Sequence, residues 1–134
     1  MREAMGGRGR RLGSPGRQRG LVSRRGWVPE RGDLLRVNFD PQAGHEQREW
    51  RPALVISPRA YNEASSLALL CPVTSKAKGY PFEVPLPPGL PIAGVILADQ
   101  VRALDWRARG AQHAGDAPHE IVDEVLARLV PLVT

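Results

Sequence analysis

Two short, continuous apolar runs constrain the fold of this 134-residue chain more than any other feature of its sequence. They are Pro52–Ser57 and Leu67–Thr74, and each is too short for a typical buried helix. Continuous apolar runs of this length, bounded by turn-forming residues, are typical of central strands. We therefore expect two central strands. Pro52 should be confined to the start of the first, because proline has no N–H to donate within a sheet.

Shorter strand-like segments flank these two runs. Asp33–Phe39 alternates apolar and polar side chains, which suits a half-buried strand. Pro58–Ser66 is expected to be a short helical turn or loop. Phe82–Leu86 should pair with the second apolar run or with a neighbour of it, and Val95–Val101 should form another strand. Short strands with turn signals between them predict a mainly β (α+β) fold, either a small barrel or a strongly curved antiparallel sheet.

The C-terminal segment has the periodicity of a helix. Pro118 suits its first turn, Asp116 or Ala117 is placed to cap it, and Glu120 lies near the positive end of the helix dipole. Polar residues that should face solvent recur along it at Asp123, Glu124 and Arg128. Apolar residues at helical spacing predict a face that packs on the sheet, and they are Ile121, Val122, Val125, Leu126 and Leu129.

The positive charge of the chain is concentrated at its N-terminus. The net charge is +5, but residues 1–26 contain eight arginines and a single glutamate. Residues 27–134 contain eleven Lys and Arg against thirteen Asp and Glu, so this part is slightly acidic. A basic footprint for nucleic acid across the whole domain is therefore absent, and an RNA site in this part must be a local patch.

Residues 1–26 also contain seven glycines and almost no apolar side chains. Such a segment cannot bury enough surface to offset the entropy of ordering it. We predict a disordered Arg/Gly-rich extension, followed by one folded domain over residues 27–134. Two interpretations of the extension stay open: a basic arm that holds RNA non-specifically, or an overextended gene start with initiation near Val22.

Composition disfavours several classes of protein. Cys71 is the single cysteine, which excludes an internal disulfide and a cysteine-based zinc site, and we expect it to be a buried small hydrophobe. The sequence has no apolar run of about 18 residues that would span a bilayer. No apolar segment of a signal peptide follows the basic start. These features predict a cytoplasmic protein with no membrane contact.

Side chains of the kinds that bind phosphate are gathered in the segment Pro72–Val84. Thr74 and Ser75 supply hydroxyls, Lys76 and Lys78 supply ammonium groups, and a Gly-Tyr-Pro turn follows. Hydrogen-bond donors and cations on a rigid element beside a loop suit a phosphate ligand. The alternative interpretation is a β-hairpin with a lysine-rich tip.

This segment is one of several blocks with a familiar order and spacing. The others are Gly32-Asp33-Leu34, Asn38–Pro41, Gly44–Gln47, Arg51–Ser57 and Leu97–Val101. In these blocks the chain, from about Val22 to its C-terminus, resembles the MazF/PemK family of toxin endoribonucleases. The resemblance implies an SH3-like barrel with appended helices, of the CcdB/Kid/MazF type, assembled as a homodimer. It also implies a sequence-specific nuclease that cleaves single-stranded mRNA and is inhibited by a MazE-like antitoxin, whose acidic tail covers the RNA groove.

RNA can be cut without a metal ion or cofactor, because its own 2′-OH is the nucleophile. A base removes the 2′-OH proton, an acid protonates the departing 5′-oxygen, and cations stabilise the charge of the phosphorane. The products are a 2′,3′-cyclic phosphate and a 5′-OH end. A metal-independent site of this kind needs a base, an acid and anion donors within a few ångströms of one another.

The resemblance assigns catalytic roles to Arg51, Thr74 and Glu46. Arg51 enters its strand from a polar loop and offers a planar fork for phosphate, although alone it also fits an arginine whose stem lies along apolar surface. Since arginine keeps its proton at neutral pH, an electrostatic role is favoured over simple general acid catalysis. The Thr74 hydroxyl is expected to donate a hydrogen bond to phosphate. Glu46 is either the base or the partner that orients Arg51.

Six further residues are candidate RNA contacts. Among them, Gln47 offers an amide to a base edge, the lysines offer phosphate contacts, and Tyr80 offers a ring for base stacking. Phe82 also has a stacking ring but suits the core better. The full set is His45, Gln47, Ser75, Lys76, Lys78 and Tyr80.

Three features of the sequence leave alternatives open. His113 and His119, near the C-terminal helix, are interpreted as solvated surface residues. The block Trp106–Arg109 fits an RNA contact, a dimer contact or a purely structural role. Arg48-Glu49-Trp50 stands where relatives usually carry small residues, which leaves the RNA target and the activity open.

The alternative functions are a gyrase-binding toxin of the CcdB type, with contacts at the C-terminal helix, and a non-catalytic RNA-binding module.

Overall fold

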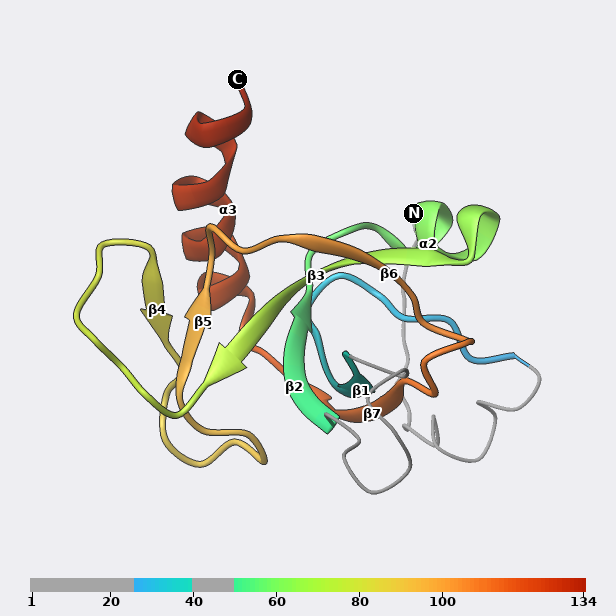
Figure 1. Cartoon of the computed structure of the whole chain (residues 1–134), viewed down its shortest axis with the longest axis horizontal. Helices are drawn as coiled ribbons and strands as arrows, with labels where there is room; N and C mark the ends of the chain where they lie inside the picture. The colour runs from blue at the N-terminus through green and yellow to red at the C-terminus, as the bar shows by residue number, and fades with distance from the viewer. Residues whose placement is uncertain (1–25, 40–49) are drawn as a thin grey trace.

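The structure, a computed structural model, describes residues 26–39 and 50–134 (Figure 1). The disorder was predicted for residues 1–26, and all of these except Gly26 lie outside the described residues. In chain order the elements are β1 (Asp33–Asn38), β2 (Trp50–Val55), α2 (Arg59–Ser65), β3 (Leu67–Thr74), β4 (Glu83–Pro85), β5 (Val95–Leu97), β6 (Arg102–Asp105), β7 (Gln112–Asp116) and α3 (His119–Val133).

The seven strands form one antiparallel sheet in the order β4-β5-β3-β2-β1-β7, and β6 pairs with β3 beside this path. The sheet curves strongly, and α3 stands beside its β4–β5 end (Figure 1). The expected mainly β fold with a C-terminal helix is confirmed. The sheet is open, with β4 and β7 at the two ends of its path. No helix in the described part of the chain is long and apolar enough to cross a membrane.

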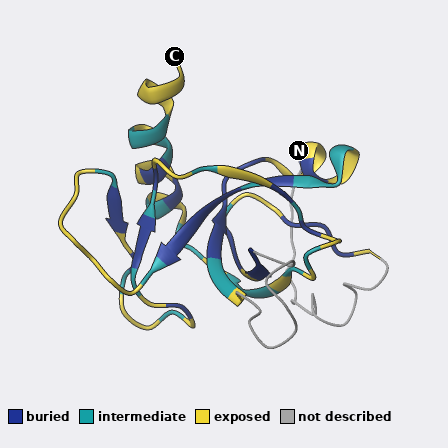
Figure 2. Cartoon of the chain, viewed as in Figure 1, coloured by how far each residue is buried: buried dark blue, intermediate teal, exposed yellow. Residues whose placement is uncertain are grey.

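The two apolar runs are central strands, as predicted, and both of their faces are buried (Figure 2). Successive side chains of a strand point to opposite faces of a sheet. In β2, Leu54 packs in the cluster beside α3, whereas Ala53 and Val55 pack in a second cluster that contains Trp27 and Trp106. A strand with a hydrophobic core on each face needs apolar residues at every position, and this explains the continuous runs.

The first strand differs from its prediction as a half-buried strand. Leu34 packs in the cluster beside α3, and Leu35 and Val37 pack in the second cluster. Arg36 is the exposed residue of β1, and even Asn38 is buried. The face of β1 with Arg36 and Asn38 was expected to meet solvent. In the structure β1 is a central strand between β2 and β7, and a hydrophobic cluster covers each face of the sheet there.

The β3 strand changes its partner partway along one edge. Leu67–Leu70 pairs with β6, whereas Val73 and Thr74 pair with β5. Pro72, which has no N–H, lies between these two paired stretches. After Pro72, this edge of β3 pairs with β5. The strand β4 therefore pairs with β5 and forms no backbone hydrogen-bond ladder with β3. The hairpin interpretation of the lysine-rich segment is therefore wrong, and Phe82–Leu86 pairs with a neighbour of the second run.

Other strand boundaries also needed the tertiary structure. Pro52 is the third residue of β2, not its first, and it lies opposite Arg36. The strand expected over Val95–Val101 ends at Leu97, where the N–H of Gln100 bonds to the Leu97 carbonyl in a turn. Strands β6 and β7 were not predicted, because their sequences, RALD and QHAGD, have no apolar alternation. Backbone pairing with β3 and β1 supplies their structure.

The helix α2 confirms the short helical turn expected at Pro58–Ser66. Asn62 fixes it to the rest of the protein, since its fully buried side chain donates to the carbonyl of Pro29 at 2.8 Å and accepts from the Ser57 hydroxyl. The indole N–H of Trp106 donates to the Asn62 carbonyl at 3.0 Å. Asn62 thus joins α2 to two distant segments of the chain.

The helix α3 packs on the sheet, as predicted. Val122 and Val125 are buried in the cluster beside it, and Ile121, Leu126 and Leu129 pack against that cluster. Its start differs from the prediction, because Pro118 occupies the N-cap position and no side chain caps the helix. Glu120 lies in the first turn, as expected.

Arg128 does not face solvent freely, in contrast to Asp123 and Glu124, which are exposed as predicted. Its guanidinium donates to the carbonyl of Pro81 and pairs with the Glu124 carboxylate at 2.6 Å. The long arginine side chain reaches across to β4, which helical periodicity alone does not reveal.

Candidate active site

A cleft of about 190 Å³ lies where β2 and β3 meet the segment that joins β3 to β4. Five of its lining residues were predicted from the sequence as site residues, and three were not. The lining residues are Arg51, Thr74, Lys76, Lys78, Tyr80, Glu83, Leu97 and Gln100. Among the described residues, three cations and a single carboxylate line this space, and this part of the lining has a net positive charge suited to a phosphodiester.

Strand register explains why Arg51 and Thr74 meet. In the antiparallel pairing of β2 with β3, Ala53 lies opposite Pro72. Continuing this register by two residues in each strand places Arg51 opposite Thr74, with both side chains on the same face of the sheet. The two residues that were proposed from separate motifs thus share one wall of the cleft.

Phe39 supports the guanidinium of Arg51 from the side of the core. The guanidinium carbon lies 5.7 Å from the centre of the Phe39 ring, and that of Arg102 lies 5.2 Å from the same centre. Phe39 is buried, and Arg51 is half-buried. A cation over an aromatic face is stabilised by about 0.5–2 kcal/mol, so the ring helps to hold the arginine fork in place.

The Thr74 side chain is half-buried, and its oxygen accepts a hydrogen bond from the backbone N–H of Lys76 at 3.1 Å. Accepting this bond leaves the hydroxyl proton available for a phosphate oxygen. Gly94 packs so closely on Thr74 that a Cβ built on it would lie 2.3 Å from the Thr74 carbonyl oxygen. The position of Thr74 is therefore fixed by its contact with Gly94 and by its pairing with Val95 of β5.

The segment Ser75–Pro81, which we call the lysine loop, forms the outer wall of the cleft. Lys76, Lys78 and Tyr80 line it, and Tyr80 is 61% exposed, so its ring is open to a partner. The loop is exposed along its length (Figure 2). Ser75 is exposed and does not line the cleft, whereas Phe82 is half-buried.

Glu83, Leu97 and Gln100 line the cleft but were not among the predicted site residues. Glu83 is buried, and its carboxylate accepts hydrogen bonds from the backbone N–H groups of Lys78 and Gly79. A carboxylate inside the apolar stretch Phe82–Leu86 is the sequence signal that was available for it, because a charge in such a stretch needs partners. Leu97 and Gln100 were noted only as part of a familiar block.

Three predicted residues, His45, Glu46 and Gln47, lie outside the described residues, so their roles stay predictions. In the block Trp106–Arg109, the structural interpretation applies to Trp106 and Arg109. Trp106 is buried edge-on against Trp27, with ring centres 5.7 Å apart. Arg109 donates to the carbonyls of Asn38 and Phe39. Arg107 is exposed and stacks on the outer side of Trp106, 4.6 Å from the ring centre.

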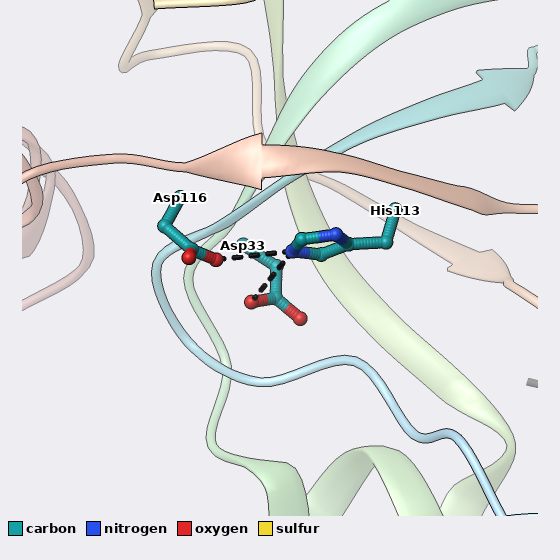
Figure 3. Close-up of side chains that lie close together, drawn as sticks. All are labelled: Asp33, His113 and Asp116. Carbon is teal, nitrogen blue, oxygen red and sulfur yellow. Dashed lines mark hydrogen bonds and ion pairs between the residues drawn. The ribbon is translucent and has the colours of Figure 1, made fainter. Parts of the chain in front are cut away.

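His113 was expected to be a solvated surface residue, and this is wrong. It lies in β7 with its side chain only 20% exposed, and its Nε2 atom is 3.0 Å from Asp116 and 3.8 Å from Asp33 (Figure 3). This group of three residues lies where β1 begins, whereas Arg51 pairs with Val37 near the end of β1, so the group is separate from the cleft. His119 is exposed, as predicted.

Cys71 is fully buried, as expected. Burial raises the pKa of its thiol from 9.0 to about 12, and the nearby charge of Asp99 adds to this shift. A buried thiol with a raised pKa is a poor nucleophile at neutral pH.

The chain is similar to known proteins over most of its length. The Escherichia coli protein named "Endoribonuclease toxin MazF" is 46% identical over 113 residues, which cover 84% of this chain and 99% of the relative. "Endoribonuclease PemK" of Escherichia coli is 40% identical over 109 residues, which cover 78% of this chain and 82% of that relative. A crystal structure of MazE-MazF from Deinococcus radiodurans has a TM-score of 0.76 and 54% identity, covering 81% of this chain and 97% of its own.

A family model described as "PemK-like, MazF-like toxin of type II toxin-antitoxin system" matches residues 30–133. The match spans every described strand and both helices, and it includes the five predicted residues that line the cleft. With relatives this similar over nearly their whole length, the chain belongs to the PemK-like, MazF-like toxin family of type II toxin–antitoxin systems.

Proposed function

We propose that this chain is a sequence-specific endoribonuclease toxin that cleaves single-stranded mRNA without a metal ion. The observation that carries the proposal is the meeting of Arg51 and Thr74, which are 23 residues apart in the sequence, in one cation-lined cleft. The names of the relatives, which are endoribonucleases at 40–46% identity, support it.

The side chains of the cleft suit cleavage by the 2′-OH of the RNA itself. As the 2′-oxygen attacks, negative charge grows on the non-bridging phosphate oxygens, where the Arg51 fork and the Thr74 hydroxyl supply donors. Lys76 and Lys78 hold neighbouring phosphates and set the affinity. Glu46 is proposed to take the 2′-OH proton or to orient Arg51. The products are a 2′,3′-cyclic phosphate and a 5′-OH end.

Recognition of the RNA sequence is assigned to four residues outside the proposed catalytic set. The exposed ring of Tyr80 suits stacking on an unpaired base. Gln47 and His45, in the segment before β2, are proposed to contact base edges, and Ser75 is proposed as a further hydrogen-bonding group. These contacts require bases that are not paired, which favours a single-stranded substrate.

An RNA cleavage assay in EDTA tests this proposal. We expect the wild-type protein to cut, and Arg51→Ala and Thr74→Val each to lose about 10²–10³-fold in rate, as removal of one transition-state donor does elsewhere. Arg36→Ala is the matched control, because Arg36 is an exposed arginine outside the cleft. If the double variant Arg51→Ala, Thr74→Val cut RNA at the wild-type rate, the assignment of this cleft as the active site would be wrong.

The same assays separate the two alternative functions. The relatives are named as endoribonucleases, which disfavours a gyrase-binding toxin. If this protein inhibited the DNA supercoiling activity of purified gyrase, the gyrase-binding function would be favoured instead. A non-catalytic module would bind labelled RNA and leave it intact. Mapping the ends of RNA cut in vitro reports the target sequence and the end chemistry together.

We also propose a cytoplasmic homodimer that is silenced by a MazE-like antitoxin. Structures of MazE-MazF from Deinococcus radiodurans support the antitoxin, and the cationic cleft suits the acidic tail that we expect of it. Exposed apolar side chains at the end of α3, Val130, Leu132 and Val133, are consistent with a second subunit. Light scattering measures the mass in solution, and a mass of one chain would contradict the dimer.

We propose residues 27–134 as the complete nuclease unit. Deletion of residues 1–26 should then leave the rate of RNA cleavage unchanged. A large loss of rate at low salt would favour the basic-arm interpretation of the extension instead.

A further inference from the structure

We propose that Glu83 is a positioning residue, which holds the lysine loop in place as the outer wall of the cleft. The inference rests on the proposed function of the cleft, but it concerns a residue with no place in the chemistry described above. It explains why a carboxylate lies in a site that has to attract phosphate.

Glu83 begins β4 and is 9% exposed. One carboxylate oxygen accepts from the N–H groups of Lys78 and Gly79, both at 3.0 Å, and the other accepts from Lys78 at 3.1 Å. Hydrogen bonds to an ionised acceptor are roughly twice as strong as neutral ones. A single side chain thus ties down two successive residues of the loop.

The backbone of the loop is shaped for an anion. Gly79 has a φ of +79°, in the left-handed region, and its N–H and that of Lys78 donate to the same oxygen of Glu83. Successive N–H groups in such a conformation form an anion-binding hollow. In this protein the hollow is filled by the Glu83 carboxylate, so it is not available for a phosphate of the RNA.

The loop is fixed at two further points. At its start, the Lys76 N–H bonds to the Thr74 hydroxyl oxygen at 3.1 Å. At its end, Arg128 of α3 donates to the Pro81 carbonyl. The N–H groups of Lys76, Lys78 and Gly79 therefore bond within the protein, while the side chains of Lys76 and Lys78 line the cleft. Glu83 is the contact in the middle, between these two points.

The bonding of Glu83 suits positioning better than proton transfer. Its two oxygens accept three hydrogen bonds from the backbone, out of about four that a carboxylate can accept. A general base needs a free oxygen aimed at the 2′-OH. Loss of the carboxylate would instead leave two N–H groups without their acceptor and release the two lysines from their positions.

Two measurements on full-length protein test the inference, one of them without RNA. The variants are Glu83→Ala and Glu83→Gln, and Glu120→Gln, an exposed carboxylate on α3, is the control. Limited trypsin digestion with mass spectrometry measures the rate of cutting after Lys76 and Lys78. Steady-state RNA cleavage gives KM and kcat, and circular dichroism reports the folded fraction, with Glu83→Gln replacing Glu83→Ala if the latter does not fold.

We expect the Glu83 variants to be cut after Lys76 and Lys78 about ten-fold faster than the wild type, because the loop opens more often. KM should rise about ten-fold while kcat changes less than about three-fold, as expected for loss of binding without loss of chemistry. Loop cutting at the wild-type rate would overturn the inference. A fall in kcat with unchanged KM would also overturn it, and would make Glu83 the base.

The trypsin measurement separates this inference from the proposed function. If the wild-type protein does not cut RNA, the proposed nuclease fails, yet the role of Glu83 in holding the loop is still decided by digestion. If Arg51→Ala abolishes cleavage and the Glu83 variants leave the loop resistant, the nuclease stands and the inference fails.

Discussion

We predict that Gly94→Ala displaces Thr74 and so lowers both stability and activity, although Gly94 itself does not line the cleft. Gly94 has a φ of +129°, a conformation that side-chain-bearing residues rarely adopt. A Cβ at this position would lie 2.3 Å from the Thr74 carbonyl oxygen and 2.9 Å from its carbonyl carbon. Both neighbours are backbone atoms, so no flexible side chain can move to relieve the collision.

The magnitude follows from two separate effects. Forcing alanine into this φ costs about 1–3 kcal/mol, and the overlap with the Thr74 backbone costs roughly another 1–3 kcal/mol. At about 4 °C per kcal/mol for a domain of this size, the midpoint of thermal unfolding should fall by about 10–25 °C. Relief of the overlap requires Thr74 to move by about 1 Å, and a misplacement of this size can reduce a catalytic rate about 10²-fold.

Gly89→Ala is the matched control. Gly89 has a φ of +94°, but no atom lies within 4 Å of the position its Cβ would take. It should therefore show only the conformational cost, with RNA cleavage by the folded protein unchanged. Calorimetry and the cleavage assay, both below the unfolding midpoint of the weaker variant, compare the two. Equal midpoints and equal rates for the two variants would refute the close packing of Gly94 on Thr74.

Four further predictions follow from three buried side chains. Because burial and then Asp99 raise the pKa of Cys71 from 9.0 to about 12, iodoacetamide should not label the native thiol at about pH 8.5 but should label the unfolded chain. The pKa of the Cys71 thiol is higher in the folded than in the unfolded protein. The stability linked to the thiol is therefore present below about pH 9 and is lost between pH 9 and about 12. Cys71→Val should remove this loss of unfolding free energy, as measured by urea titrations at these pH values. Asn62→Ala should lower the free energy of unfolding by about 2–4 kcal/mol, because it leaves the Pro29 carbonyl and the Ser57 hydroxyl without this partner. A loss under about 0.5 kcal/mol in urea unfolding would contradict the role of these hydrogen bonds. Phe39→Leu should keep most of the stability but reduce RNA cleavage about three- to ten-fold, since the guanidinium of Arg51 loses its aromatic support, and an unchanged rate would contradict that role.

The sequence allowed the candidate site to be predicted only in part. Arg51 and Thr74 were proposed from separate motifs, and the register of β2 with β3 explains why both predictions lead to one cleft. Glu83 was missed because its importance depends on the N–H groups of Lys78 and Gly79, whose direction is set by the loop conformation. His113 was misinterpreted because its neighbour Asp33 is 80 residues away in the sequence.

The sequence by itself determined the two central strands and the helix α3, and its resemblance to a family led to the proposal of Arg51 and Thr74. A strand with a core on each face leaves a continuous apolar run, and a helix with one packed face leaves apolar residues at helical spacing, so both are visible in one dimension. Only the tertiary structure decided that β5 lies between β3 and β4, that the polar strands β6 and β7 exist, and that Glu83 faces the cleft. The physical reason is that the strand order rests on backbone hydrogen bonds between distant segments, and backbone groups are the same in every residue type except proline. The contacts of Glu83 depend instead on the conformation of the lysine loop.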